Sequence, residues 1–250
     1  MAVSEANRMI AGEDEDGKPL WPERWPRERL EAKRREIGSR AYAQEFLNDP
    51  SQYEGNYFQR QWFRVVDDWP RDARLCRYWD LAATEARGGS DPDWTAGVLM
   101  AEKGGQFWVV DVKRKRGRPA EIKALVGQTA QLDGQAVAIR MEQEGGASGK
   151  SLIEDYARTV LVGYNFQGVK PTGSKEVRAA PLSAAAENGN VHLVRGRWNA
   201  DFLDELEEFP AGAHDDQVDA ASGAYAYLSR DERQGAYTDL GILGYADVGV

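Results

Sequence analysis

The order of strand-like and helix-like segments between residues 71 and 230 constrains the fold more than any other feature. Three short strand-like runs come first, at residues 74–82, 95–101 and 106–112, and a turn with two glycines separates the last two. Strand-like segments then follow at 136–141, 166–169 and 191–194, among helix-like segments at 119–132, 151–161, 175–187, 200–208 and 215–228. This order predicts an α/β fold in which three antiparallel strands precede parallel strands, with helices on both faces of the mixed sheet.

The remaining residues divide into an arm and a tail. Residues 1–70 carry several prolines and no strand-like alternation, so we expect a connector arm that is partly helical between about residues 26 and 46. Residues 71–230 form the main domain. Residues 231–250 contain glycines and no periodic pattern, which predicts a flexible C-terminal tail.

Composition limits which kinds of metal site the chain can form and where in the cell we expect it. Cys76 stands alone in the sequence, and His192 and His214 are too few for a histidine-rich zinc site. A bound metal would therefore be held mainly by carboxylates, which favours Mg²⁺ or Mn²⁺. The sequence has no long apolar run and no signal-peptide pattern, so we expect a soluble, intracellular protein.

The distribution of charge matters more than its sum. A formal net charge of −9 is unfavourable for contacts with phosphate groups. Basic residues nevertheless gather in one short run, which consists of Lys113, Arg114, Lys115, Arg116 and Arg118. This run is either a phosphate-binding surface or a solvated hairpin end, since short blocks of like charge are common on protein surfaces.

Acidic residues end two of the predicted strands and begin the last predicted helix. Asp80 ends the first strand of the main domain and Glu142 ends the fourth, so adjacent parallel strands would bring their carboxylates to one edge of the sheet. Asp215, Asp216 and Asp219 open the last helix at spacings that place two or three of them on one face of its first turn.

Such a cluster of acids points to a divalent metal site. Carboxylates that converge repel one another, and their pKa values rise unless cations neutralise them. Two hard divalent ions there could activate a water and stabilise the leaving oxygen in phosphodiester cleavage. Each acid also has a structural explanation: Asp80 as a strand-end cap, Glu142 as an ion-pair partner of Arg140 or Lys150, and Asp215 as a helix N-cap.

Three separated segments resemble the C-terminal nuclease domain of phage large terminase subunits. They are RYWDLAAT with SDPDWTAGVL, RMEQEGGASGKS, and the stretch from GSKEVRAAP to the HDDQVDAASGAYAYL helix. The resemblance covers about residues 60–230, and residues 20–63 resemble the connector that follows the family's ATPase domain. It implies an RNase H-like fold, related to RuvC-type resolvases, with two Mg²⁺ or Mn²⁺ ions that cut concatemeric double-stranded viral DNA during genome packaging.

Carried over by motif, Asp80 matches the family's first-strand aspartate, Glu142 the acid that ends the fourth strand, and the HDD helix the third acid. Within that helix the D-x-x-D-A pattern favours Asp216, with Asp219 and Asp215 behind it. Asp93 is either an outer metal contact or, as we prefer, a turn cap. Further candidate phosphate contacts, which are equally consistent with ordinary surface cations, are Lys150, Lys175 and Arg178.

The resemblance also implies partners that this chain does not contain. They are the portal protein, the small terminase subunit and an ATPase motor, in the host bacterial cytoplasm at the procapsid portal. The chain has no Walker A motif ahead of the nuclease segments, so we expect either a domain of a longer protein or a naturally split nuclease.

Two other functions remain open from the sequence. One is a non-catalytic packaging module that docks on the portal or on DNA. The other is a nucleotide-binding ATPase, because Gly145, Gly149, Lys150 and Ser151 lie between a strand and a helix, although their spacing misses the phosphate-loop pattern by one residue.

Overall fold

The computed structural model describes residues 12–14, 17–47, 57–82 and 94–230. It contains a seven-stranded sheet with the order β1-β7-β4-β3-β2-β5-β6. The strands are β1 (Arg64–Val66), β2 (Arg74–Asp80), β3 (Thr95–Lys103), β4 (Gln106–Lys115), β5 (Ala138–Glu142), β6 (Phe166–Val169) and β7 (Val191–Val194). Strands β2, β3 and β4 are antiparallel, whereas β5, β6 and β7 join the sheet by parallel pairing. The predicted fold class is confirmed.

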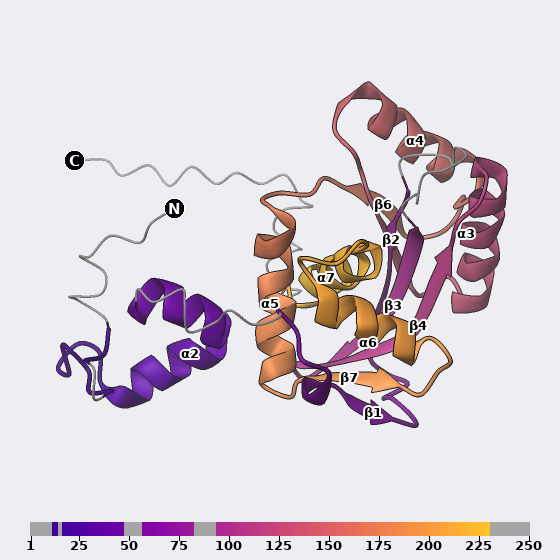
Figure 1. Cartoon of the computed structure of the whole chain (residues 1–250). Helices are drawn as coiled ribbons and strands as arrows, with labels where there is room; N and C mark the ends of the chain where they lie inside the picture. Colours follow the sequence, from indigo (N-terminus) through magenta and orange to yellow (C-terminus); the bar gives the residue numbers. More distant parts are fainter. Residues whose placement is uncertain (1–11, 15–16, 48–56, 83–93, 231–250) are drawn as a thin grey trace, which may run out of the picture.

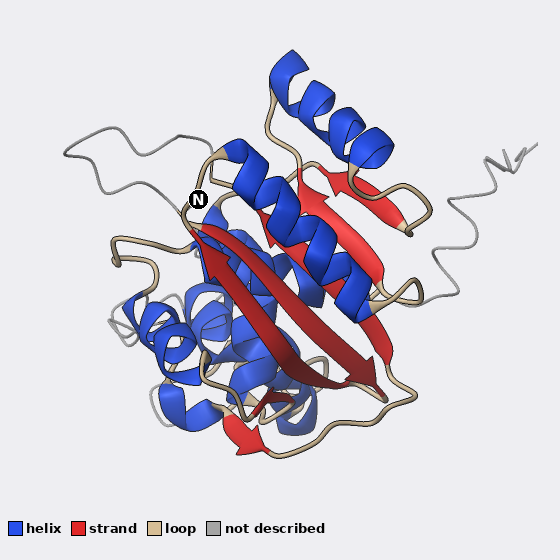
Figure 2. Cartoon of the chain, turned by 90° about the vertical axis from the view of Figure 1, so that its right-hand side faces the viewer, coloured by secondary structure: helices blue, strands red, loops and turns tan. Residues whose placement is uncertain are grey.

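Helices cover both faces of the sheet, as Figures 1 and 2 show. On one face α3 (Pro119–Asp133) and α4 (Gly146–Thr159) pack around the Trp79 side chain of β2. On the other face α5 (Lys175–Glu187), α6 (Asn199–Glu208) and α7 (Asp216–Leu228) build the larger core around Tyr78 and its neighbours. Successive β2 side chains point to opposite faces, which separates the two cores.

Three local features differ from the sequence expectations. Strand β1 lies within the stretch expected as arm and pairs with β7; the pattern gave no sign of it because it spans only three largely exposed residues. Helix α4 begins at Gly146 rather than at residue 151. Strand β4 extends to Lys115 rather than ending at residue 112, so Lys113, Arg114 and Lys115 belong to the strand, at the open end of the β3–β4 hairpin. The division at residue 70 stays a prediction, as does the tail, which lies outside the described residues.

The glycines that imitate a phosphate loop have a helical role. Gly145 is the N-cap of α4, and Gly149 packs so closely that a Cβ there would lie 2.1 Å from the Glu144 carbonyl oxygen. Lys150 is exposed on the helix. The segment from β5 to α4, all of which the structure describes, therefore contains no loop that wraps around phosphates, and this removes the main reason for the ATPase hypothesis.

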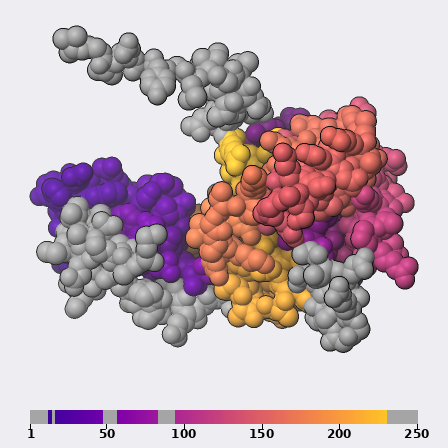
Figure 3. Space-filling view, turned by 90° about the horizontal axis from the view of Figure 1, so that it is seen from above, coloured from indigo at the N-terminus to yellow at the C-terminus, as the bar shows by residue number. Residues whose placement is uncertain are grey.

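Residues 17–47 of the arm form a small helical lobe beside α5 (Figures 1 and 3). Helix α2 (Arg27–Tyr42) is followed by a π-helical turn, Ala43–Leu47, and Leu30, Tyr42 and Phe46 form its own apolar cluster. Gly38 interrupts α2 with φ 81° and lies so close to α5 that a Cβ would come within 2.9 Å of Ala184.

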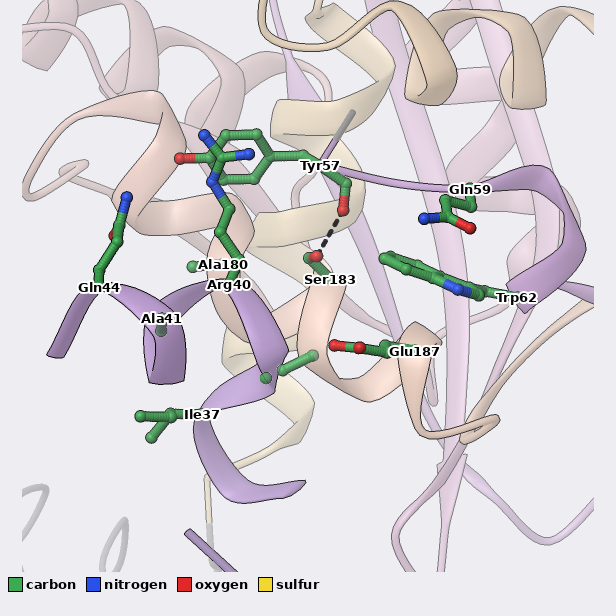
Figure 4. Close-up of a pocket in the computed structure, with 12 residues that line it drawn as sticks. Ile37, Arg40, Ala41, Gln44, Tyr57, Gln59, Trp62, Ala180, Ser183 and Glu187 are labelled. Atoms are coloured by element: carbon green, nitrogen blue, oxygen red, sulfur yellow. Dashed lines mark hydrogen bonds between the residues drawn. The ribbon is translucent and has the colours of Figure 1, made fainter. Parts of the chain in front are cut away.

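A cavity of about 200 Å³ lies where the arm meets α5 (Figure 4). There the Arg40 guanidinium lies 4.2 Å from the centre of the Tyr57 ring, and the Ser183 hydroxyl donates to the Tyr57 carbonyl at 2.5 Å. A short 3₁₀ turn, Arg60–Trp62, then leads into β1. Among the described residues, no helix combines the length and apolar character needed to cross a membrane.

Candidate active site

The two strand-end acids lie side by side. Strands β2 and β5 are adjacent and parallel, and Trp79 pairs with Met141, so the next residues, Asp80 and Glu142, emerge together at the same edge of the sheet. Each is the last residue of its strand. The condition that the sequence left open, adjacency of these two strands, is met.

Helix α7 brings the third group of acids against this edge. Asp216 and Asp219 lie in its first turn and are buried, with 6% and 3% of their surface exposed. Asp215 is at the N-cap position, but its side chain makes no capping hydrogen bond. Asp215 therefore occupies the N-cap position, but its carboxylate does not cap the helix.

One guanidinium bridges two of the acids directly. Arg178 Nη1 lies 2.6 Å from a Glu142 oxygen, and Arg178 Nη2 lies 3.1 Å from an Asp219 oxygen. Glu142 thus pairs with Arg178 of α5 and not with Arg140 or Lys150. Because one planar group contacts both carboxylates, Asp219 is the acid of the HDD helix that shares a partner with Glu142. The preference for Asp216 stays a prediction.

Lys175 neutralises the other side of the cluster. Its Nζ lies 2.6 Å from an Asp215 oxygen and 3.3 Å from an Asp219 oxygen. Burial lowers the pKa of Lys175, but its hydrogen bond to Asp215 and the charge of Asp219 outweigh burial and raise that pKa above its usual range. Lys175 and Arg178 are therefore not free surface cations; both are held by the acid cluster. Their contact with DNA stays a prediction.

The acids perturb one another strongly. Burial raises the pKa of Asp80 well above its usual value, and the charges of Glu142, Asp219 and Asp216 raise it further. Burial raises the pKa of Asp219 to about 6, against the opposing effect of Arg178 and Lys175. Burial is the largest cause of both shifts, so these acids lie where a negative charge is costly unless a cation is close by.

The donor set fits a hard divalent cation in its chemistry. Its members are carboxylates from three separate elements, and their mutual repulsion is what an added cation would relieve. Within the part of the chain that the structure describes, no three acidic, histidine or cysteine side chains form a ready-made cation site as they stand. The guanidinium of Arg178 lies between Glu142 and Asp219, so those two oxygens face a cation that the chain itself supplies.

Asp216 is held by groups that sequence reasoning did not select. The backbone N–H of Trp94 donates to Asp216 Oδ2 at 3.2 Å, and His214 Nδ1 lies 3.9 Å from the same oxygen. The sequence signalled only that His214 precedes the acids. Trp94 could not have been found, because its contact with Asp216 spans 122 residues of chain. Asp93, the residue before it, lies outside the described residues.

Much of the predicted basic run makes contacts within the protein. The guanidinium carbons of Arg114 and Arg116 lie 4.3 and 4.1 Å from the centre of the Trp94 ring. Arg114 also pairs with Glu205 at 3.1 Å, and Arg116 hydrogen-bonds His214 at 3.0 Å. These two arginines therefore pack near the start of α7, beside the acid cluster.

The other members of the run have a different placement. Lys113 pairs with Asp111 at 3.0 Å on β4, and Lys115 ends that strand. Arg118 is the exposed N-cap of α3, and its backbone N–H donates to Glu121 at 2.8 Å. None of these contacts tests whether these residues, or Lys150 on α4, bind DNA, so that role stays a prediction.

Solved structures of phage proteins share this fold. The large terminase of a thermophilic bacteriophage matches with a TM-score of 0.58 and 14% identity, over 81% of this chain and 52% of that chain. The large terminase nuclease of the thermophilic phage G20c matches with a TM-score of 0.50 and 16% identity, over 69% of this chain and 98% of that chain. This chain thus spans about half the length of the first of these proteins. No curated protein sequence matches it significantly.

A family model assigns the chain more directly than these distant likenesses. The model for the terminase RNase H-like domain matches residues 77–228, which is more than half of the chain and includes Asp80, Glu142 and the HDD helix. The chain belongs to the terminase RNase H-like domain family.

Proposed function

We propose that this chain is a divalent-metal-dependent endonuclease that cleaves concatemeric double-stranded viral DNA during genome packaging. The observation that carries the proposal is the surplus of carboxylates at one sheet edge. Lys175 and Arg178 contact three carboxylates, Glu142, Asp215 and Asp219. Burial and the charges of Glu142, Asp219 and Asp216 raise the pKa of a fourth, Asp80. Family membership and the shared fold support the same function.

Asp80, Glu142 and an acid of the HDD helix would hold the metal. Asp219 is favoured because Arg178 contacts both it and Glu142, and Asp216 is favoured by the sequence motif. When bound, Mg²⁺ or Mn²⁺, which we propose to act as a pair of ions, supplies a Lewis acid that activates water and offsets charge on the phosphodiester. A metal ion there would compete with Arg178 for Glu142 and Asp219, and a displaced guanidinium would be available to a phosphate oxygen.

The surrounding residues fix the acids in place. Trp94 holds Asp216 through its backbone N–H, and the stack of Arg114 and Arg116 on the Trp94 ring connects the end of β4 to the start of α7. We propose that the cations at the edge of this region, with Lys115 and Arg118 foremost, contact DNA phosphates without reading the bases. The DNA sequence at which cleavage occurs is then chosen by partner proteins.

The wider assembly belongs to the same proposal. The chain covers about half of the large terminase of the thermophilic bacteriophage, and we propose that an ATPase motor acts beside it, in the same polypeptide or as a separate subunit. The portal protein and the small terminase subunit complete the complex at the procapsid, in the cytoplasm of the infected bacterium.

Nicking of supercoiled plasmid tests this function. Purified protein is expected to cleave with Mn²⁺ or Mg²⁺ and not in EDTA, and Asp80→Asn or Glu142→Ala should lower the rate by about 1000-fold, the scale of losing a main electrostatic stabiliser. Asp111→Asn, which changes a carboxylate of the same sheet away from the cluster, is the matched control and should keep activity.

Full cleavage by folded Asp80→Asn protein would remove Asp80 from the site. If folded wild-type protein neither cleaves plasmid nor gains thermal stability from either metal, the non-catalytic packaging module is the better description of this chain.

A further inference from the structure

A second cavity adjoins the acid cluster. It has a volume of about 310 Å³ and lies between α5, α7 and the loop that follows β6. Arg178 and Asp219, the ion pair described above, form part of its wall. Glu142 pairs with Val169 on β6, which also lines the cavity, so the space opens at the same sheet edge as the strand-end acids.

The lining combines apolar surface with positive charge. Tyr78, Val169 and Pro181 give it apolar walls, and the Tyr227 ring lies on α7 where the Arg140 guanidinium stacks on it at 4.4 Å. Cations are contributed by Lys170, Arg178 and Arg230. Asp219 is the single acid among the described residues that line the cavity, and Arg178 pairs with it and with Glu142. Lys170 and Arg230 are therefore the cations that give this wall the positive charge to attract an anion.

A buried hydroxyl supports the presence of a ligand. Ser222 lines the cavity and is only 3% exposed, yet its Oγ has no hydrogen-bond partner among the described residues. Buried polar atoms are normally hydrogen-bonded, so an unpaired one calls for a partner outside the chain. Ser222 follows Asp219 by three residues and therefore lies on the same face of α7.

We propose that this cavity binds one nucleotide of an unpaired DNA strand next to the phosphodiester that is cut. The proposal rests on the nuclease function proposed above. The cations take the phosphate, the Tyr227 ring and Pro181 take the base, and Ser222 hydrogen-bonds a polar edge of the nucleotide. The volume lies at the lower end of the range for ligand pockets, so it suits a single nucleotide and is too small for a base pair.

The position of the cavity gives this binding a use. Asp219 and Arg178 belong to both sites, so a nucleotide held in the cavity fixes the adjacent phosphate beside Asp80 and Glu142. A base inside a duplex faces its partner and cannot enter, so the cavity selects a strand end or a locally opened duplex. Stacking on aromatic walls accepts any base, which agrees with cleavage that depends little on sequence.

Binding of a mononucleotide without metal tests the proposal. Calorimetric titrations in EDTA at low salt would compare deoxyadenosine monophosphate with inorganic phosphate. We expect the nucleotide to bind at least about fivefold more tightly than phosphate, because stacking adds to the ionic contact. Equal affinity for the two would reduce the cavity to a plain anion site and overturn the proposal.

A pair of tryptophan substitutions localises the binding. Ala226→Trp introduces a bulky ring from an exposed position that lines the cavity, and it should weaken nucleotide binding by about tenfold or more. Ala157→Trp, at an exposed position on α4, is the matched control and should change nothing. If Ala226→Trp fails to fold, Ser222→Ala serves instead, with an expected loss of about threefold, the effect of one hydrogen bond. Unchanged affinity in the cavity variant would place the nucleotide elsewhere.

A strand comparison tests the preference for unpaired DNA. Ala226→Trp should weaken binding of a single-stranded oligonucleotide much more than binding of a duplex closed by hairpins at both ends, and equal weakening would contradict the proposal.

Stabilisation by Mn²⁺, measured on the same variants, separates the cavity proposal from the nuclease proposal. If Mn²⁺ stabilises the protein but no nucleotide binds, only the cavity proposal fails; if Mn²⁺ has no effect and plasmid is not cut, the nuclease proposal fails.

Discussion

Strand β2 carries an ion cluster on each of its faces, and the two are built differently. On the α3 face, Arg77 is 1% exposed and contacts Asp133 with two nitrogens at 2.8 Å each and Asp111 with one at 2.8 Å. Lys113 also pairs with Asp111, so two carboxylates meet two cations. On the α7 face, Lys175 and Arg178 contact three carboxylates, Glu142, Asp215 and Asp219. The charges of Glu142, Asp219 and Asp216 also raise the pKa of Asp80 there.

This contrast separates a structural ion cluster from a functional one. The Nε of Arg77 is hydrogen-bonded to Asp133, whereas the Nε of Arg178 is buried and has no partner among the described residues. A balanced, fully bonded cluster stabilises the fold and asks for no further ion. A cluster with surplus negative charge and raised pKa values is costly to keep, which is the usual sign of a site that binds something.

Stability should distinguish the two clusters most strongly. Asp133→Ala removes one of the two carboxylates that contact the buried Arg77 guanidinium and should lower the free energy of unfolding by about 3 to 5 kcal/mol. Asp80→Asn removes one repelling charge and should raise it by on the order of 1 kcal/mol in metal-free protein. Urea unfolding in EDTA measures both. Destabilisation by Asp80→Asn as large as that by Asp133→Ala would make the two clusters equivalent.

Divalent metal should stabilise only one of the clusters. At an Mn²⁺ concentration about 100-fold above its dissociation constant, the free energy of unfolding of the wild type should rise by about 2.7 kcal/mol. Asp80→Asn should lose most of this gain, and Asp111→Asn should keep it. Thermal unfolding with and without Mn²⁺ gives the comparison, and a gain that survives in Asp80→Asn would place the ion elsewhere.

The pH dependence of stability should also distinguish the ion clusters on the two faces of β2. The pKa of Asp219 is about 6 in the folded protein against 3.8 for an ordinary aspartate, so between these values the native state holds a proton that the unfolded state releases. Stability of metal-free protein should therefore fall as the pH rises through this window, by about 1 to 3 kcal/mol at 1.36 kcal/mol per pKa unit. The shift of Asp80 acts in the same direction.

Urea unfolding across that window measures this slope. Asp219→Asn should flatten it, whatever its effect on overall stability, while Asp111→Asn should leave it unchanged. A slope that is equally steep in Asp219→Asn would mean that other groups titrate in this range.

The smallest effect is expected on DNA affinity, when basic residues near the end of β4 are replaced. Lys115 and Arg118 lie at the end of β4 and the start of α3, where the chain leaves the sheet beside the Trp94 stack. Replacing both by alanine should weaken DNA binding about equally for all sequences and reduce the salt slope by about 1 for each lost phosphate contact. Lys103→Ala, at the opposite end of the β3–β4 hairpin, is the control. Identical salt slopes in the variant and the control would exclude this surface.

The amino-acid pattern alone was enough to predict the order of strands and helices and the place of two acids. Hydrophobic periodicity is a local property, so the long segments were predicted close to their observed bounds, and Asp80 and Glu142 were found because each interrupts the end of an apolar run. Strand β1 was missed because it is short and exposed, and the start of α4 because its first turn is rich in glycine.

Which charges face one another became clear only in three dimensions. The pairing of Arg178 with Glu142 spans 36 residues, and that of Lys175 with Asp215 spans 40, so no local pattern could have distinguished them from surface cations. The same holds for the cavity beside Ser222, whose walls come from β2, β6, α5 and α7. Periodicity acts through neighbouring residues along the chain, whereas packing joins side chains that the chain itself keeps far apart.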